Sequence, residues 1–193
     1  MSETDVTLRW LEWWHGGFWL DAHPSWRQAL PFPAPVAALA RVHGGALRRR
    51  LGITDTPLPL PQPQLLTLLA LNADARALLL ALVAEICTGG TALPGELKVW
   101  CRRMTKGLRP ESWLPVPPTG QKPAITSLTL LQSHYFDYWP RLRMAFEYDD
   151  VNRCPPLPLA LESRRLHPLW EAALWQCKRA QSESGEEYKH VAT

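Results

Sequence analysis

The sequence lacks the residue clusters of a metal centre. Its four cysteines, Cys87, Cys101, Cys154 and Cys177, are widely separated, and no CxxC pair or Cys/His cluster occurs. Zinc sites need such clusters, because several ligands must converge on one ion. Three of the cysteines lie on the apolar faces of predicted helices, where we expect them to act as small buried hydrophobic side chains. We therefore predict no metal and no cofactor.

Catalytic motifs are missing as well. The one local grouping of interest is Ser133, His134 and Asp137, which lies on one predicted helix and lacks the strand-turn-helix elbow that presents a hydrolase serine. We interpret His134 as an ordinary helix residue, solvated or partly buried. The carboxylates of residues 147–150 have no EF-hand spacing, and no glycine pair is followed by the lysine of a P-loop. The sequence therefore predicts a protein that is not an enzyme.

An uninterrupted apolar run of membrane-spanning length is also absent. The most hydrophobic stretch, residues 65–87, has roughly the required length, but Asn72, Asp74 and Arg76 lie in its middle, where ionisable groups cost several kcal/mol. We predict instead two buried helices, with Asn72 as the N-cap of the second. The first residues, MSETDVTLRW, are polar and acidic, unlike a signal peptide. These features predict a cytoplasmic protein without membrane insertion.

Length and composition indicate a globular helical protein. The 193 residues are 46% hydrophobic and 20% charged, which suits a buried core and argues against global disorder. Apolar residues recur mainly at helical spacing, and proline-rich connectors follow at 54–64, 115–123 and 155–158. We predict a mainly α, compact single domain over residues 1–180, followed by a polar, disordered tail at 181–193. The alternation in LRMAFEY allows one small strand pair.

Three further helices are predicted outside the centre of the chain. The first covers residues 35–51 and closes with an arginine triplet, residues 48–50, which either stabilises the helix C-terminus or binds a partner. The second covers residues 124–139, although its pattern also suits a strand. The third covers residues 159–180, and Pro168 divides it.

Aromatic residues are concentrated near the N-terminus. The chain has ten tryptophans, and Trp10, Trp13 and Trp26 are among the five in the first 30 residues. We predict a first helix that ends at the glycine pair 16–17 and a short helix that begins at Pro24. The aromatic side chains either cover the core or form an exposed docking patch. We favour the core, and take these three tryptophans as the candidates for a patch.

The stretch 95–115 predicts an amphipathic helix with a basic face. Its apolar residues recur at three- and four-residue spacing, and Gly107 and Pro110 mark its end. These apolar residues are Leu97, Trp100, Cys101, Met104 and Leu108. The cations that lie on the other faces or follow the helix are Lys98, Arg102, Arg103, Lys106 and Arg109. Four of them, Arg102, Arg103, Lys106 and Arg109, are our candidate partner-binding residues.

Nucleic acid is the alternative partner for these cations. Together with the arginine triplet they would line a phosphate-binding surface beside Trp100 or Trp113. Against this, no helix-turn-helix or RNA-binding motif occurs, and the formal net charge of +3 is small. A solvated helix face also explains the charges. A basic helical nucleic-acid-binding or regulatory protein therefore stays the second hypothesis, and we expect no bound nucleic acid.

Three stretches of the chain resemble the SctK/YscK-type accessory proteins of bacterial type III secretion systems, including the HrpD-like members. They are the aromatic region with His23-Pro24 and Trp26, the segment LPLPQPQLLTLLAL, and the segment WCRRMTKGLRPESWLP. Together they cover about half of the chain.

The resemblance implies a non-enzymatic cytoplasmic adaptor of the sorting platform, at the cytoplasmic face of the inner membrane. Members of that family link the cytoplasmic domain of the SctD-type inner-membrane ring protein to the SctQ-type pod protein. The family has no catalytic or cofactor-binding residues, so the resemblance implies none for this chain. If the resemblance holds, we expect two binding surfaces. One is the basic helix face, and the other is formed by exposed members of the N-terminal tryptophan cluster.

Overall fold

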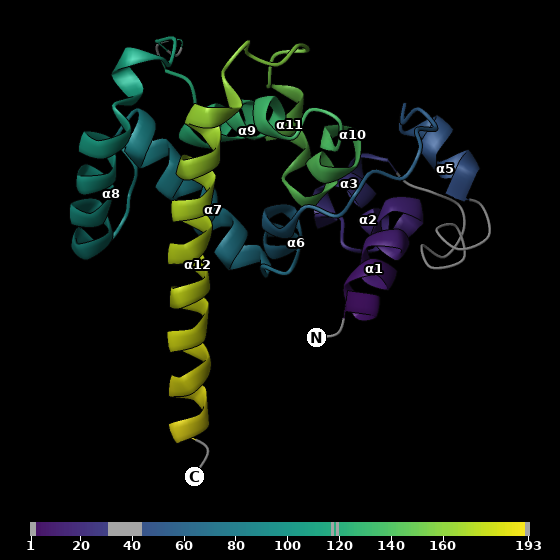
Figure 1. Ribbon diagram of the computed structural model, residues 1–193, viewed down its shortest axis with the longest axis horizontal. Coiled ribbons are helices and arrows are strands. Elements are labelled where there is room, and N and C mark those ends of the chain that lie inside the picture. Colours follow the sequence, from purple (N-terminus) through teal and green to yellow (C-terminus); the bar gives the residue numbers. More distant parts are fainter. Residues whose placement is uncertain (1–2, 31–43, 117, 119, 192–193) are drawn as a thin grey trace. The chain divides into compact units, whose positions relative to one another are not determined.

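All regular structure in the described part of the chain is helical (Figure 1). The computed structural model describes residues 3–30, 44–116, 118 and 120–191, with the side chains from residue 182 onward left out. The prediction of a mainly α fold is confirmed. No helix among the described residues has the length and hydropathy needed to cross a membrane.

The strand pair allowed by LRMAFEY is wrong, because the backbone of this segment has other partners. It forms the end of α10 (Trp139–Leu142), a 3-10 turn η3 (Arg143–Ala145) and the start of α11 (Tyr148–Asn152). The Met144 carbonyl accepts a bond from the His23 amide at 2.8 Å, and the Phe146 carbonyl accepts one from Trp26 Nε1 at 2.8 Å. Helices of the N-terminal region therefore occupy the groups that a second strand would need.

The described residues gather in two compact units, where we expected a single domain. The first unit combines Met1–Leu69 with Tyr135–Arg153, and the second combines Ala70–His134 with Cys154–Thr193. Each unit is thus built from two separate stretches of sequence.

The first unit consists of short helices around an aromatic core. Besides α10, η3 and α11 it contains α1 (Glu3–Glu12), the π-helical turn η1 (Trp13–Gly17), α2 (Phe18–Leu20), α3 (Pro24–Ala29), α5 (Gly44–Arg50) and α6 (Pro63–Leu69). Residues 53–62, which hold most of the predicted proline-rich linker, have no regular structure. The predicted helix 35–51 is confirmed from Gly44 to Arg50, and its first part lies outside the described residues.

The glycine pair 16–17 does not end the first helix as we predicted. The chain continues through the π-helical turn into α2, and Gly16 is buried. A β-carbon at Gly17 would lie 3.0 Å from the Glu12 carbonyl oxygen. These glycines therefore permit a close backbone approach in a wide turn, and the helix goes on beyond them.

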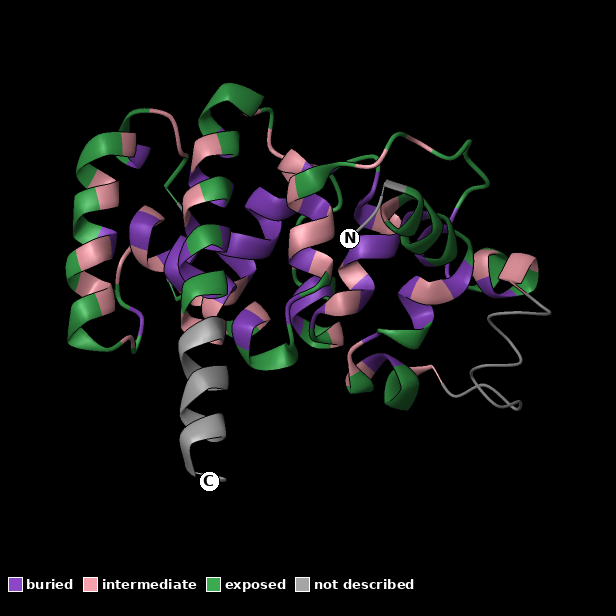
Figure 2. Cartoon of the chain, turned by 60° about the horizontal axis from the view of Figure 1, so that its bottom comes forward, coloured by how far each residue is buried: buried purple, intermediate pink, exposed green. Residues whose placement is uncertain are grey.

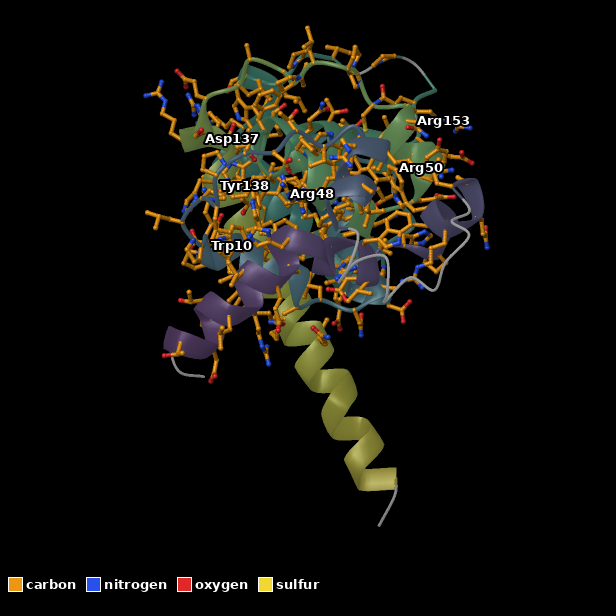
Figure 3. The ribbon with its side chains drawn as sticks, turned by 90° about the vertical axis from the view of Figure 1, so that its right-hand side faces the viewer. Trp10, Arg48, Arg50, Asp137, Tyr138 and Arg153 are labelled. Carbon is orange, nitrogen blue, oxygen red and sulfur yellow. The ribbon has the colours of Figure 1, made fainter. Side chains whose placement is uncertain are left out.

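The N-terminal tryptophans form the core of the first unit. Trp10, Trp13 and Trp26 are only 0%, 6% and 2% exposed. Trp10 stacks on Trp13 with ring centroids 5.2 Å apart, and its Nε1 donates to the Pro59 carbonyl at 2.7 Å. Figure 3 shows Trp10 beside Tyr138, whose ring centroid lies 5.7 Å away. The favoured interpretation of these tryptophans as core residues is therefore confirmed, and the alternative of an exposed docking patch is wrong.

The second unit is organised around α7 (Ala73–Cys87), which packs against the other long helices of the unit. These are α8 (Gly95–Leu108), α9 (Pro123–His134) and α12 (Ser163–Val191), with a short turn η2 (Pro110–Ser112) after α8. Asn72 caps α7 as predicted, since its side-chain oxygen accepts a bond from the Ala75 amide at 2.8 Å. Ser127 of α9 donates to the Leu80 carbonyl at 2.7 Å, which fixes α9 on α7.

Two expectations for α9 and α12 need correction in detail. The helix alternative for residues 124–139 is confirmed by α9, but α9 ends at His134, five residues early. Pro168 does not divide the last helix, because it lies only six residues into α12 and removes a single backbone donor there. Helix α12 runs to Val191 and so includes most of the segment 181–193 that we predicted as a polar tail.

Candidate functional site

Helix α8 is fixed to α7 along one side. Cys101 is fully buried on that side. Thr105 Oγ1 donates to the Ile86 carbonyl of α7 at 2.8 Å and also lies 3.0 Å from the Cys101 carbonyl. Figure 2 shows buried and intermediate residues on this side of α8 and exposed residues on the opposite side. The opposite side is therefore presented to solvent in a fixed orientation.

The four predicted partner-binding cations lie together on this solvent side. Arg102, Arg103, Lys106 and Arg109 are all exposed, and we call them the α8 basic face. Arg103, Lys106 and Arg109 form no side-chain hydrogen bond or ion pair with any residue that the structure describes. Val99, which is 45% exposed, lies among them. The face thus combines uncompensated positive charge with a small apolar area.

Glu85 of α7 balances part of the charge at the edge of this face. Its carboxylate accepts two bonds of 2.8 Å, from the amide and the hydroxyl of Thr91. Burial raises the pKa of Glu85, but these bonds and the positive charges of Lys98 and Arg102 outweigh it, so the pKa lies below its usual value. Arg102 therefore has a nearby anion, whereas Arg103 and Lys106 form no ion pair with any residue that the structure describes.

Arg109 has a backbone conformation that is unusual for its residue type. It caps α8 at φ 47° and ψ 57°, in the left-handed region where glycine is normally found. An arginine in this region costs about 1 kcal/mol relative to glycine. Its charge lies at the C-terminus of α8, where a cation interacts favourably with the helix dipole. The left-handed backbone conformation therefore costs some stability, and the Arg109 side chain places a positive charge at the end of the basic face.

Replacing Arg109 with glycine is expected to raise the free energy of unfolding by about 0.5 kcal/mol. Relief of the strain contributes about 1 kcal/mol, and loss of the C-terminal cation costs about 0.5 kcal/mol. The same substitution at Arg103, in the middle of α8, is the control and should lower stability by about 1 kcal/mol. Urea denaturation followed by circular dichroism measures both. An equal loss at the two positions would contradict the left-handed conformation.

Two half-buried tryptophans lie on or near α8. Trp100 belongs to α8 itself, and Trp113 follows η2 with its Nε1 donating to the Leu108 carbonyl at 3.0 Å. Both were predicted to lie beside the cations. Their partial exposure leaves aromatic surface near the basic face, which is typical of protein interfaces.

The arginine triplet 48–50 is only partly available to a partner. Arg48 forms an ion pair with Asp55 at 2.8 Å and donates to the His15 carbonyl at 3.1 Å. Arg49 and Arg50 are exposed at the end of α5. Gly52, at φ 66°, then turns the chain away from the helix. Arg48 therefore has a structural role within the first unit.

The grouping Ser133, His134 and Asp137 does not form a catalytic arrangement in either unit. The Ser133 hydroxyl donates to the Thr129 carbonyl at 2.9 Å and accepts from the Leu159 amide at 2.9 Å. His134 belongs to the second unit, and Asp137 belongs to the first. Burial, and secondarily the charge of His167, lower the pKa of His134 to about 4. No group of three His, Cys, Asp or Glu side chains within the described ranges could hold a metal ion.

One exposed tryptophan was not predicted from the sequence. Trp175 of α12 is 57% exposed, whereas the other nine tryptophans, all within the described ranges, are buried or intermediate. The spacing of the apolar residues along α12 predicts that Trp175 is exposed. Its apolar stripe runs through Leu169, Trp170, Ala173, Leu174 and Cys177, and Trp175 lies off that stripe.

Comparison of the chain with protein-family models, with curated proteins and with solved structures gives no match. The function proposed below therefore depends on the chain's own residues and on the sequence resemblance described above.

Proposed function

We propose that the protein is a non-enzymatic adaptor that binds acidic protein surfaces through the α8 basic face. The observation that supports this is the cluster of four exposed cations on one side of a helix, three of which have no partner among the described residues. Bonds from Thr105 to α7 hold the helix in place. Little conformational freedom of the backbone is therefore lost when a partner binds.

An acidic helix or acidic loop is the partner that fits this face. The cations from Arg102 to Arg109 extend along about 10 Å of helix axis, which corresponds to two turns of a facing helix. Exposed charge pairs of this kind raise the association rate and select the partner, while adding less to affinity. Val99 and the half-buried Trp100 supply the apolar contact that stable interfaces also need.

The cellular setting is taken from the sequence resemblance. On that basis the protein works in the cytoplasm, at the inner-membrane face of a type III secretion system. There it links the SctD-type ring protein to the SctQ-type pod protein and supports protein secretion. The α8 basic face would bind one of these two proteins.

The test is a binding measurement with purified proteins. The chain is immobilised, and the SctQ-type protein and the cytoplasmic domain of the SctD-type protein from the same bacterium are applied by biolayer interferometry. The double variant Arg102→Glu, Arg103→Glu should associate about tenfold more slowly with one of them, because attraction becomes repulsion. Raising the salt concentration should reduce the difference between wild type and variant.

The matched control reverses two exposed charges of the first unit, Arg49→Glu with Arg153→Glu, and should leave binding unchanged. Binding of either secretion protein that is equal for all three chains would support the adaptor function but reject the α8 basic face. Absence of binding, together with salt-sensitive retention of a 20-nucleotide DNA or RNA probe, would reject the adaptor and favour the nucleic-acid alternative.

A further inference from the structure

The outer side of α12 carries an exposed tryptophan. The inner side of the helix packs on α7 and α9, and Leu169, Trp170 and Cys177 are buried there. Trp175 lies on the other side and exposes 57% of its surface, so it contributes little to the core. Figure 2 shows exposed residues along this side of α12. A large aromatic side chain in this position is typical of a protein interface.

The charges around Trp175 differ in sign on its two sides: Glu171 precedes it, and the exposed cations Lys178 and Arg179 follow it. Glu171 precedes it by four residues and Arg179 follows it by four, so each lies on the same side of the helix and about 6 Å from it along the axis. The Arg179 guanidinium lies 5.5 Å from the Trp175 ring centroid. Glu171 forms no ion pair with any residue in the described ranges.

We propose that this side of α12 pairs with the same side of a second copy of the chain, in antiparallel orientation. A two-fold axis at Trp175 brings Glu171 next to Arg179 of the partner subunit, and Arg179 next to Glu171 of the partner subunit. Such an interface is isologous, because one patch serves both copies. The tryptophan rings meet at the axis, and two opposite-charge pairs flank them.

The charge order favours this occupant over others. A parallel pair of the same helices would place Glu171 against Glu171 and Arg179 against Arg179, which is repulsive. A uniformly acidic partner would oppose Glu171, and a uniformly basic partner would oppose Arg179. Only a partner with the reversed order of charges satisfies both positions, and an antiparallel second copy has that order.

One helix side is small for a protein interface, so we expect a weak dimer. A dissociation constant between about 1 and 100 µM is typical of limited contact areas. Sedimentation velocity of the full chain from 2 to roughly 300 µM should show a reversible monomer–dimer equilibrium. The Trp175→Ala variant should dissociate at least tenfold more readily. A wild-type chain that stays monomeric over the whole range would overturn the proposal.

Charge reversal distinguishes the antiparallel pair from any other mode of association. Glu171→Arg alone and Arg179→Glu alone should each weaken the dimer about tenfold, since each creates like-charge contacts across the axis. An equimolar mixture of these two variants should form a heterodimer within about threefold of wild-type affinity, because both contacts between positions 171 and 179 are then of opposite sign. Failure of the mixture to recover affinity would overturn the antiparallel arrangement.

The control is the α8 variant Arg103→Glu, which should leave the dimer constant unchanged. Circular dichroism checks that all variants keep their helix content. Dimer formation that depends on Arg103 and not on Trp175 would also overturn the proposal, because it would place self-association on α8. Loss of adaptor binding by the α8 variants has no bearing on this result, since the α8 and α12 surfaces carry different residues.

Discussion

The Trp10→Ala variant is expected to lose about 4 kcal/mol of unfolding free energy. Trp10 is fully buried, stacks on Trp13 and donates a 2.7 Å bond to the Pro59 carbonyl. Alanine would leave a large cavity between α1 and the 53–62 linker, and it would remove the partner of that carbonyl. Since the total stability of a domain is typically about 5–15 kcal/mol, the first unit should become marginally stable. Urea denaturation and the thermal midpoint measure the loss.

Two further variants separate the contributions of Trp10. Leu8→Ala on the same helix removes a side chain that is 53% exposed, and we expect less than about 0.5 kcal/mol of change. Trp10→Phe keeps most of the aromatic contact but loses the hydrogen bond to the Pro59 carbonyl. We therefore expect a loss of unfolding free energy between those of Trp10→Ala and Leu8→Ala. If Trp10→Ala left stability intact while it weakened partner binding, Trp10 would belong to a docking patch after all.

Acidification is expected to destabilise the second unit by about 3 kcal/mol through His134 alone. The folded state lowers the pKa of His134 from 6.5 to about 4, chiefly by burial and further by the charge of His167. The neutral imidazole is therefore favoured when folded, and the unfolded chain takes up the proton first. The contribution is fully present above pH 6.5 and is lost as the pH falls through the range from 6.5 to about 4.

The His134→Gln variant isolates this contribution from the other titrating groups. Between pH 7 and pH 4 the wild type should lose about 3 kcal/mol more than the variant, as measured by urea denaturation at each pH. His167→Gln removes only the smaller cause and should keep most of the pH dependence. Parallel stability profiles for wild type and His134→Gln would show that His134 is not held neutral in the folded state.

Local features of the chain were predictable where a single physical factor decides them. Asn72 precedes an apolar run that polar residues interrupt, and both the cap and the break between α6 and α7 follow from that pattern. The spacing of α8 also placed Arg102, Arg103 and Lys106 correctly on the solvent side, whereas Lys98 is half-buried. In each case the side-chain periodicity of one helix was sufficient information.

Other features depend on contacts between distant residues, which periodicity does not contain. The indole N–H of the buried Trp26 donates to the carbonyl of Phe146, 120 residues away. LRMAFEY alternates as a strand would, yet its carbonyl groups bond to the N-terminal helices. The exposure of Trp175 was within reach, because its offset from the apolar stripe of α12 is visible in the sequence.

The interleaving of the two units has a consequence for synthesis of the protein. The first unit needs Tyr135–Arg153 as well as Met1–Leu69, so the ribosome must translate the 84 residues that follow Leu69 before all of its segments exist. At about 5–20 residues per second, this takes about 4–17 s. During that interval Trp10 of α1 has no access to Tyr138, and Trp26 has no access to Phe146. The core aromatic side chains of the nascent N-terminal segment therefore stay without these packing partners for several seconds.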